Sequence, residues 1–358
     1  MPAAHINRIG TAVPPHDVHR KFVDYAPSLL CSERDRRLFG RMAERSQIEH
    51  RYSFFEPDPD PAAVDRGGFF HAGGFPDTAA RMRFFERHAP GLAASAVDAM
   101  GIDDVRSRIT HVIVTTCTGF HAPGLDLHLV ERFGLAAAVE RTVVGFMGCY
   151  AAINGLKLAR HIVRSEPASL VLMVNLELCT LHLQRTSDIE AVLSFLIFAD
   201  GCSACLIGAE PEGIAIEGFR AAVIPDSAGE ITWRIGGLGF DMHLAGTVPR
   251  TIARGLPDAL PDMLGGRHVG EVDLWAVHPG GRTVLDAVGQ AAGLDAERLA
   301  DSRAVLRDFG NMSSATVVFV LKRMLDRFRS RGIGGNGLGC ALAFGPGLTA
   351  ESMTFRMA

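Results

Sequence analysis

The chain has 358 residues, of which 47% are hydrophobic and 21% are charged, and its formal net charge at pH 7 is -4. This composition is typical of a soluble globular protein with room for two fused halves or one large α/β unit. It excludes the strongly basic surface that holds nucleic acid by counterion release.

The ends and the cysteines of the chain indicate where the protein works. Residues 1–10 lack the basic-then-apolar order of a signal peptide, and the longest uncharged apolar stretch, Thr142 to Leu156, is too short to span a bilayer. The seven cysteines are irregularly spaced, which fits reduced thiols better than a disulfide framework. We therefore expect a cytoplasmic protein.

The first 90 residues or so look irregular and accessory. They contain a charged helical stretch, Ser32 to Arg45, followed by a loop rich in Pro, Asp and Gly, Glu56 to Pro76. The core is expected to begin near Thr110.

From Thr110 onward, apolar runs that read as buried strands alternate with helical segments. Predicted strands of the first half are His111–Thr116, Thr142–Phe146 and Ser169–Asn175, with helices Pro123–Phe133 and Ala151–Val163. Two further segments, Cys202–Ile207 and Ile214–Phe219, are expected to close this half as an antiparallel pair.

The second half repeats this order. Its predicted strands are Val272–Val277, Gly339–Phe344 and Ser352–Met357, and its predicted helices are Arg282–Ala292 and Ser313–Arg329. The glycine-rich segment Gly332 to Gly339 follows a helix and precedes a strand, the reverse of a phosphate-binding loop, so we expect a turn there.

Four residues with matching spacing suggest that the halves are duplicates. Cys117 precedes Cys149 by 32 residues, and His278 precedes Asn311 by 33. Cys149 and Asn311 each open a helix with small residues in its first turn. A duplicated βαβα unit would place the two helix N-termini opposite each other across one site.

Cys149 is the candidate nucleophile. It follows Gly148 and precedes a strongly helical run. A helix N-terminus favours a thiolate, and a neighbouring imidazolium would lower the pKa of the thiol further. An isolated cysteine in such a helix is more often structural, so the interpretation depends on its partners.

His278 and Asn311 are those partners. His278 lies between a predicted strand and Pro279-Gly280-Gly281, at the sheet edge where α/β sites gather. Asn311 fits a helix cap, and its side-chain amide can also donate into a site. Together they can supply two hydrogen-bond donors to a thioester carbonyl and to an enolate oxygen, without a metal.

Two other pairs of residues, one of cysteines and one of aspartates, are weaker candidates for a functional site. Cys202 and Cys205 form a lone C-x-x-C on a predicted strand, where they would face opposite sides, so no zinc site is expected. Asp286 and Asp308 lie near the motifs but look structural, which leaves an acyl hydrolase without a clear water-activating base.

These motifs resemble the type III polyketide synthases, the chalcone-synthase-like branch of the thiolase fold, over essentially the whole chain. The resemblance rests on GFMGCYAAINGL around Cys149, WAVHPGGRTVLD around His278, DFGNMSSATVVFVL around Asn311 and FGPGLTAE from Phe344. It implies an α/β fold of duplicated βαβαβαββ halves, residues 1–210 and 211–358, in a five-layered αβαβα arrangement.

The resemblance also implies an activity. A homodimer would load an acyl-CoA starter onto Cys149 and extend it by decarboxylative condensation with malonyl-CoA. His278 would pair with the Cys149 thiolate and, together with Asn311, would hold the malonyl carbonyl. The chain would then be cyclised to a pyrone, a resorcinol or a related phenolic product. No acyl carrier protein, metal or redox cofactor is implied.

Further positions carry over from the same resemblance. Phe198 and, approximately, Phe240 match gatekeeper phenylalanines, and Arg41 and Arg45 match basic residues that meet CoA phosphates. Cavity or substrate contacts are implied for six more residues: Cys117, His182, Ser313, Gly345, Pro346 and Gly347.

Departures from the plant pattern leave the starter open. Cys117 and His182 replace threonines, Ala122 replaces a methionine that crosses the dimer interface, and Ala343 replaces a glycine. The alternatives are a ketoacyl-ACP synthase of fatty-acid synthesis, a cysteine-dependent acyl-thioester hydrolase and an inactive partner subunit. The HPGG and FGPG contexts speak against the first, and the intact triad speaks against the last.

Overall fold

The computed structural model describes residues 3–71, 73–331 and 337–358. Its helices are α1 (His19–Tyr25), α2 (Glu33–Arg45), α3 (Thr78–Met100), α4 (Leu125–Phe133), α5 (Ala151–Ser165), α6 (Ile189–Ile197), α7 (Val248–Met263), α8 (Arg282–Ala292), α9 (Ala300–Phe309) and α10 (Thr316–Arg331). Most of the predicted turn from Gly332 to Gly339 lies outside the described residues. None of the described helices combines the length and the apolar character that a bilayer crossing requires.

Nine strands form one continuous sheet in the order β11-β12-β13-β8-β1-β7-β6-β4-β5. They are β1 (Ala4–Ala12), β4 (His111–Thr116), β5 (Glu140–Gly145), β6 (Val171–Leu178), β7 (Asp200–Gly208), β8 (Ile214–Val223), β11 (Leu274–Val277), β12 (Leu338–Gly345) and β13 (Thr349–Met357). Two small antiparallel pairs stand apart: β2 (His16–Asp17) with β3 (Tyr52–Ser53), and β9 (Ile231–Gly236) with β10 (Gly239–Leu244).

The sheet order confirms the predicted duplication. In the first half β1, β7, β6 and β4 follow one another across the sheet with antiparallel, antiparallel and parallel pairing. In the second half β8, β13, β12 and β11 repeat the same sequence of pairings. A short antiparallel contact between β1 and β8 joins the halves.

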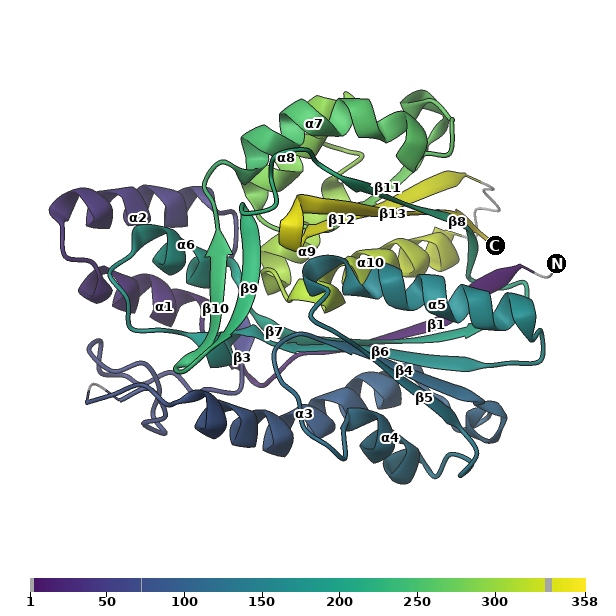
Figure 1. Cartoon of the computed structure of the whole chain (residues 1–358), viewed down its shortest axis with the longest axis horizontal. Coiled ribbons are helices and arrows are strands. Elements are labelled where there is room, and N and C mark those ends of the chain that lie inside the picture. Colours follow the sequence, from purple (N-terminus) through teal and green to yellow (C-terminus); the bar gives the residue numbers. More distant parts are fainter. Residues whose placement is uncertain (1–2, 72, 332–336) are drawn as a thin grey trace.

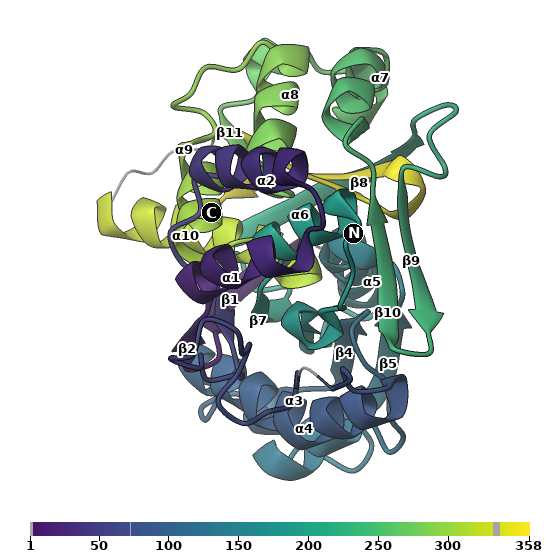
Figure 2. The same cartoon turned by 90° about the vertical axis from the view of Figure 1, so that its left-hand side faces the viewer.

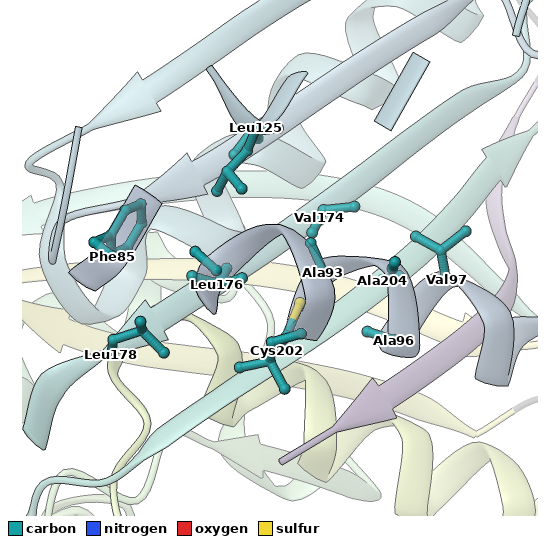
Figure 3. Close-up of a cluster of buried hydrophobic side chains, with 14 of the residues drawn as sticks. Phe85, Ala93, Ala96, Val97, Leu125, Val174, Leu176, Leu178, Cys202 and Ala204 are labelled. Carbon is teal, nitrogen blue, oxygen red and sulfur yellow. The ribbon is translucent and has the colours of Figure 1, made fainter. Parts of the chain in front are cut away.

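Three buried apolar clusters separate the layers. One lies between α3, α4 and the first half of the sheet, where Phe85, Ala93 and Leu125 meet Val174 and Leu176 (Figure 3). The second surrounds α5 and α10 in the centre, and the third lies between α7, α8 and strands β11 and β12. In Figure 1 the layers run from α7 and α8 at the top to α3 and α4 at the bottom, which is the expected αβαβα arrangement.

Two expectations about the first half were wrong. The N-terminal segment is not accessory, because β1 is the buried strand that joins the two halves and α3 covers one face of the sheet. For the same reason β7 and β8 do not pair with each other: β1 lies between them and is hydrogen-bonded to both.

Candidate active site

Cys149 lies where β5 ends and the central helix begins. It occupies the 3-10 turn η3 (Gly148–Tyr150), directly before α5. Gly148 has a φ of +67°, a left-handed conformation that glycine adopts without strain, and its missing side chain leaves room for the ring of Pro346. The cysteine lines a pocket walled mainly by apolar side chains, which we call the catalytic cavity.

Asn311 occupies the equivalent place in the second half. It follows α9 and precedes the 3-10 turn η6 (Ser313–Ala315), which packs against η3. Its backbone is bonded on both sides of Phe198: its N–H donates to Ile197 O at 2.8 Å, and the Ala199 N–H donates to its carbonyl at 2.9 Å. The predicted meeting of the two helix starts is confirmed.

The Asn311 side chain caps the following turn and directs its amide toward Cys149. Its Oδ1 accepts a hydrogen bond from the Ser313 N–H at 2.9 Å, as a capping residue does. That bond holds Ser313 at a φ of +47°, which is uncommon for a residue with a side chain. The amide Nδ2 donates weakly to Gly280 O at 3.3 Å and also faces Cys149, whose sulfur it can bond.

His278 follows β11 and is buried. Its N–H donates to Leu342 O at 2.7 Å, which fixes the chain before the Pro279-Gly280 turn. Both ring nitrogens are buried without a hydrogen-bond partner among the described residues. Because Gly280 O is bonded by Asn311, the His278 loop and the Asn311 turn form one unit. Buried unpaired nitrogens in such a place indicate a group that acts on a bound substrate.

The protonation states differ from those expected from sequence. Burial raises the pKa of Cys149 to about 12, and the Glu177 carboxylate adds to the rise, although hydrogen bonds with Ser313 and Asn311 oppose it. Burial lowers the pKa of His278 to about 3. The raised pKa of Cys149 runs opposite to the lowering expected from sequence, because desolvation is its largest cause; at rest Cys149 is a thiol and His278 a neutral imidazole.

Five of the residues expected at the cavity do line it: Cys117, His182, Phe198, Ser313 and Pro346. Gly345 and Gly347 flank Pro346, and Gly345 packs against the Tyr150 ring. Residues not anticipated from sequence complete the wall: Thr118, Cys179, Phe195, Ile231, Trp233 and Met242.

Phe240 is not among the residues that line the cavity but packs directly behind two that do. Its ring stacks on His182 with 4.3 Å between centroids, and it packs against Trp233. Met242, two residues further along β10, lines the cavity instead. Phe240 therefore supports the cavity wall through His182.

The hairpin β9–β10 covers the catalytic cavity and is held by hydrogen bonds. Trp233 Nε1 donates to Cys117 O at 2.7 Å, and the Phe240 N–H donates to His182 Nδ1 at 3.0 Å. His182 Nε2 lies 2.7 Å from Thr118 O. Because burial lowers the pKa of His182 to about 3, its ring is neutral and carries its proton on Nε2.

A buried carboxylate beside the cavity was missed from sequence. Glu177 accepts hydrogen bonds from Ser314 Oγ at 2.6 Å, Thr118 Oγ1 at 2.9 Å and the Cys117 N–H at 3.0 Å. Burial raises its pKa. The available signal was a glutamate in an otherwise apolar strand, VLMVNLEL. Asp286 and Asp308 form ion pairs with arginines, as their structural interpretation predicted.

The remaining candidates lie away from the catalytic cavity. Arg41 and Arg45 are exposed on α2, on the side of the molecule that faces the viewer in Figure 2. Cys202 packs into the cluster beneath α3 and Cys205 into the central cluster, so they face opposite sides of β7 as predicted. The described residues contain no group of three or more His, Cys, Asp or Glu placed to hold a metal ion.

Comparison with known sequences gives one consistent result. Residues 2–211 match the N-terminal domain and residues 217–358 the C-terminal domain of chalcone and stilbene synthases. The alpha-pyrone synthesis polyketide synthase-like Pks18 of Mycobacterium tuberculosis is 35% identical over 77% of this chain and 72% of its own length. Bisdemethoxycurcumin synthase of Oryza sativa is 32% identical over 98% of this chain and 91% of its own.

Comparison with solved structures agrees. The crystal structure of PKS-I from the brown alga Ectocarpus siliculosus superposes with a TM-score of 0.85 at 29% identity, over 100% of this chain and 99% of that one.

Proposed function

The chain belongs to the chalcone and stilbene synthase family and is a type III polyketide synthase, and from that premise we propose that Cys149 holds the acyl group that malonyl-CoA extends. The observation that carries this assignment is the convergence of Asn311 and Ser313 on the Cys149 sulfur at the catalytic cavity. A nucleophile with fixed donors beside it is suited to acyl transfer.

Loading is a transfer of the starter from CoA to the enzyme. The neutral His278 ring accepts the Cys149 proton, the sulfur attacks the starter thioester, and CoA leaves as its thiol after taking up that proton. Thiol and product thioester are both neutral, so the buried site stabilises the acyl-enzyme without having to hold a permanent charge.

Extension generates the attacking carbon within the same site. Malonyl-CoA loses carbon dioxide, and its electron pair passes to the thioester oxygen as an enolate. The His278 ring N–H and Asn311 Nδ2 donate to that oxygen. The enolate carbon then attacks the acyl carbon on Cys149 and expels the thiolate. The gain and loss of electrons balance among the reacting carbons, so the proposed reaction needs no external oxidant or reductant, and His278 and Asn311 supply the donors to the enolate oxygen.

The product proposed is an α-pyrone. After two extensions the enol oxygen of the distal ketone attacks the terminal thioester carbonyl, closes the ring through a C–O bond and releases the thiol. Similarity to a relative named for alpha-pyrone synthesis supports this outcome.

We further propose that the enzyme is a homodimer joined at β5 and that it binds CoA through Arg41 and Arg45. Strand β5 forms one edge of the sheet, and Val143 on it is 47% exposed, with Phe120 nearby 38% exposed. Edge strands with exposed apolar side chains favour pairing with another chain. Exposed arginines on α2 fit the phosphates of a CoA substrate.

The test separates the three steps. Starter loading is measured by intact-protein mass spectrometry, decarboxylation by carbon dioxide release, and products by liquid chromatography with malonyl-CoA and no carrier protein. Cys149→Ala should lose loading and extension, and Asn311→Ala should slow decarboxylation by about 10²–10³-fold with a smaller effect on loading.

Cys31→Ala is the matched control, because Cys31 is a free and exposed cysteine. It should load and extend like the native enzyme. Polyketide formation by Cys149→Ala would overturn the assignment of the nucleophile, and equal losses of loading and decarboxylation in Asn311→Ala would overturn the role of the amide.

A further inference from the structure

Arg51 is a buried cation between the two segments that bring Phe198 and Asn311 to the catalytic cavity. Only 2% of the residue is exposed, and it lies in the chain between α2 and β3. Burial lowers its pKa to about 10, so the guanidinium is charged at neutral pH. A buried charge is weak evidence of stabilisation, so the bonds that this guanidinium makes point to another role.

The guanidinium of Arg51 binds the end of helix α6. Its Nη1 donates to Phe198 O at 2.6 Å and to Phe195 O at 2.8 Å. Phe195 lies in the last turn of α6 and Phe198 caps it, where carbonyls lack partners within the helix and a cation complements the helix dipole. Nε donates to His19 Nδ1 at 3.0 Å, which fixes the plane of the guanidinium. Burial and the Arg51 charge lower the pKa of His19 to about 4, so this acceptor is neutral.

The Phe198 backbone in turn holds Asn311. The two residues form an isolated parallel bridge, through the pair of hydrogen bonds described above. Arg51 also touches the Asn311 turn directly. Gly310 has a φ of +68°, and a Cβ there would lie 2.8 Å from Arg51 Cγ. The stem of Arg51 therefore packs against the residue before Asn311, while its guanidinium holds the other side of the bridge.

The residues just before Arg51 bind the end of a second helix. The N–H groups of Glu49 and His50 donate to Arg307 O at 2.8 Å and 3.0 Å. Arg307 belongs to the last turn of α9, and the turn that carries Asn311 follows that helix. Three consecutive residues thus bind the C-terminal ends of α6 and α9, the two helices that lead into the bridge.

The nucleophile and its base depend on other elements. Cys149 stands on η3 at the start of α5, and the His278 N–H is bonded to Leu342 on β12. Among the described residues, Arg51 donates to neither of them. A shift of the Asn311 turn would therefore displace one donor to the malonyl carbonyl and leave the thiol and the imidazole in place.

We propose that Arg51 is a positioning residue for decarboxylation, which holds the Asn311 amide, through the Phe198 backbone, where the malonyl thioester oxygen becomes an enolate. This inference rests on the proposed function, because it gives Arg51 a part in the step that Asn311 assists. Arg51 itself acts only on the protein backbone and does not touch the substrate. Since a displacement of about 1 Å can cost about 10²-fold in rate, loss of the guanidinium should slow decarboxylation and spare loading.

Two substitutions of Arg51 test the proposal. Arg51→Met removes the hydrogen bonds and keeps most of the volume. Its release of carbon dioxide from malonyl-CoA should slow by about 10–10²-fold, while single-turnover loading of an acyl-CoA, followed by intact-protein mass spectrometry, stays within about threefold. Arg51→Lys keeps the charge but replaces the planar fork by one ammonium group, so decarboxylation should slow by about three- to tenfold. It is also the second variant if Arg51→Met does not fold.

Arg81→Met is the matched control. Arg81 is likewise fully buried and donates to main-chain carbonyls, those of Leu181 and Pro76, which lie outside the Asn311 turn. Its substitution should lower Tm as Arg51→Met does and should keep the native ratio of decarboxylation rate to loading rate. A purely structural role for Arg51 would give both arginine variants that native ratio.

The outcomes separate this inference from the function on which it rests. Equal losses of loading and decarboxylation in the Arg51 variants, or decarboxylation within about twofold of the native rate, overturn the positioning role. The same selective loss in Arg81→Met also overturns it, because any buried arginine would then have this effect. An Asn311→Ala enzyme that decarboxylates at the native rate overturns the role of the amide, and a native enzyme that neither loads acyl-CoA nor decarboxylates malonyl-CoA overturns the proposed function itself.

Discussion

Gly148→Ala is predicted to be one of the most damaging small substitutions in the chain. Gly148 has a φ of +67°, and a Cβ there would lie 2.4 Å from Pro346 Cδ and 2.8 Å from Cγ. Left-handed backbone costs an alanine about 1–2 kcal/mol. A proline ring cannot rotate out of the way, so the clash adds about 1–3 kcal/mol of overpacking. We expect a total destabilisation of about 2–5 kcal/mol.

Substitution of a second glycine, Gly134, separates the cost of the steric clash from the cost of the left-handed backbone. Gly134 ends α4 at a φ of +57°, and a Cβ there would meet nothing within 4 Å. Gly134→Ala should therefore cost only about 1–2 kcal/mol. The excess cost of Gly148→Ala corresponds to a Tm about 2–6 °C lower than that of Gly134→Ala, measured by thermal denaturation.

The same substitution should act on chemistry. Relief of the clash moves the residue next to Cys149, and a shift of about 1 Å in a reacting group can cost about 10²-fold. Single-turnover loading of an acyl-CoA, followed by intact-protein mass spectrometry, should slow far more in Gly148→Ala than in Gly134→Ala. Equal Tm values for the two variants, together with loading rates within about threefold, would refute the reasoning.

Three further perturbations follow from the geometry. Burial raises the pKa of Asp200 from 3.8 to about 7, so its contribution to stability is full below about pH 4 and is lost as the pH rises to about 7, by up to about 4 kcal/mol. Asp200→Asn should flatten the fall in Tm between pH 5 and pH 8, and an unchanged slope would contradict this. Glu177 helps to raise the pKa of Cys149, so Glu177→Gln should move iodoacetamide labelling of Cys149 to lower pH; a shift upward, or none, would count against the charge effect. Trp233→Ala should enlarge the catalytic cavity and give products with more malonyl units by mass spectrometry, whereas Trp233→Phe should keep most of the native product; identical products from both would show that Trp233 does not limit extension.

Helices and strands whose burial and ends follow a simple local pattern were predicted well from sequence. Strand β4 and helix α8 have the predicted bounds, because the first is apolar through its middle and buried on both faces and the second begins and ends at glycines. Strand β1 was missed because His5, Asn7 and Arg8 interrupt its apolar pattern, although all three find partners or cover in the folded chain. Helix α3 was missed because Pro90 lies within it and its buried face is largely alanine.

The candidate site was predictable where local turns define it. Cys149, His278 and Asn311 were found from a glycine turn, a strand end and a matched spacing, and the two helix starts do meet. Glu177, Trp233 and Met242 were not found, because they reach the cavity only through long-range pairing: β6 lies in the sheet interior, and the β9–β10 hairpin folds over from the second half.

Burial explains why Cys149 is a neutral thiol at rest and not the thiolate expected from sequence. It also explains why a neutral sulfur suits the reaction. A helix N-terminus favours a thiolate by a modest amount, whereas burial, the largest cause of the shift, raises the pKa of Cys149 to about 12. The site therefore disfavours charge at rest, and the acyl thioester, which is neutral, is the form of Cys149 that burial stabilises. The thiolate needs to exist only while the acyl group is transferred, when Asn311 and Ser313 can donate hydrogen bonds to it. In the proposed reaction the carbanion forms beside His278 and attacks the Cys149 thioester in a site covered by the β9–β10 hairpin, where exclusion of water favours condensation over hydrolysis.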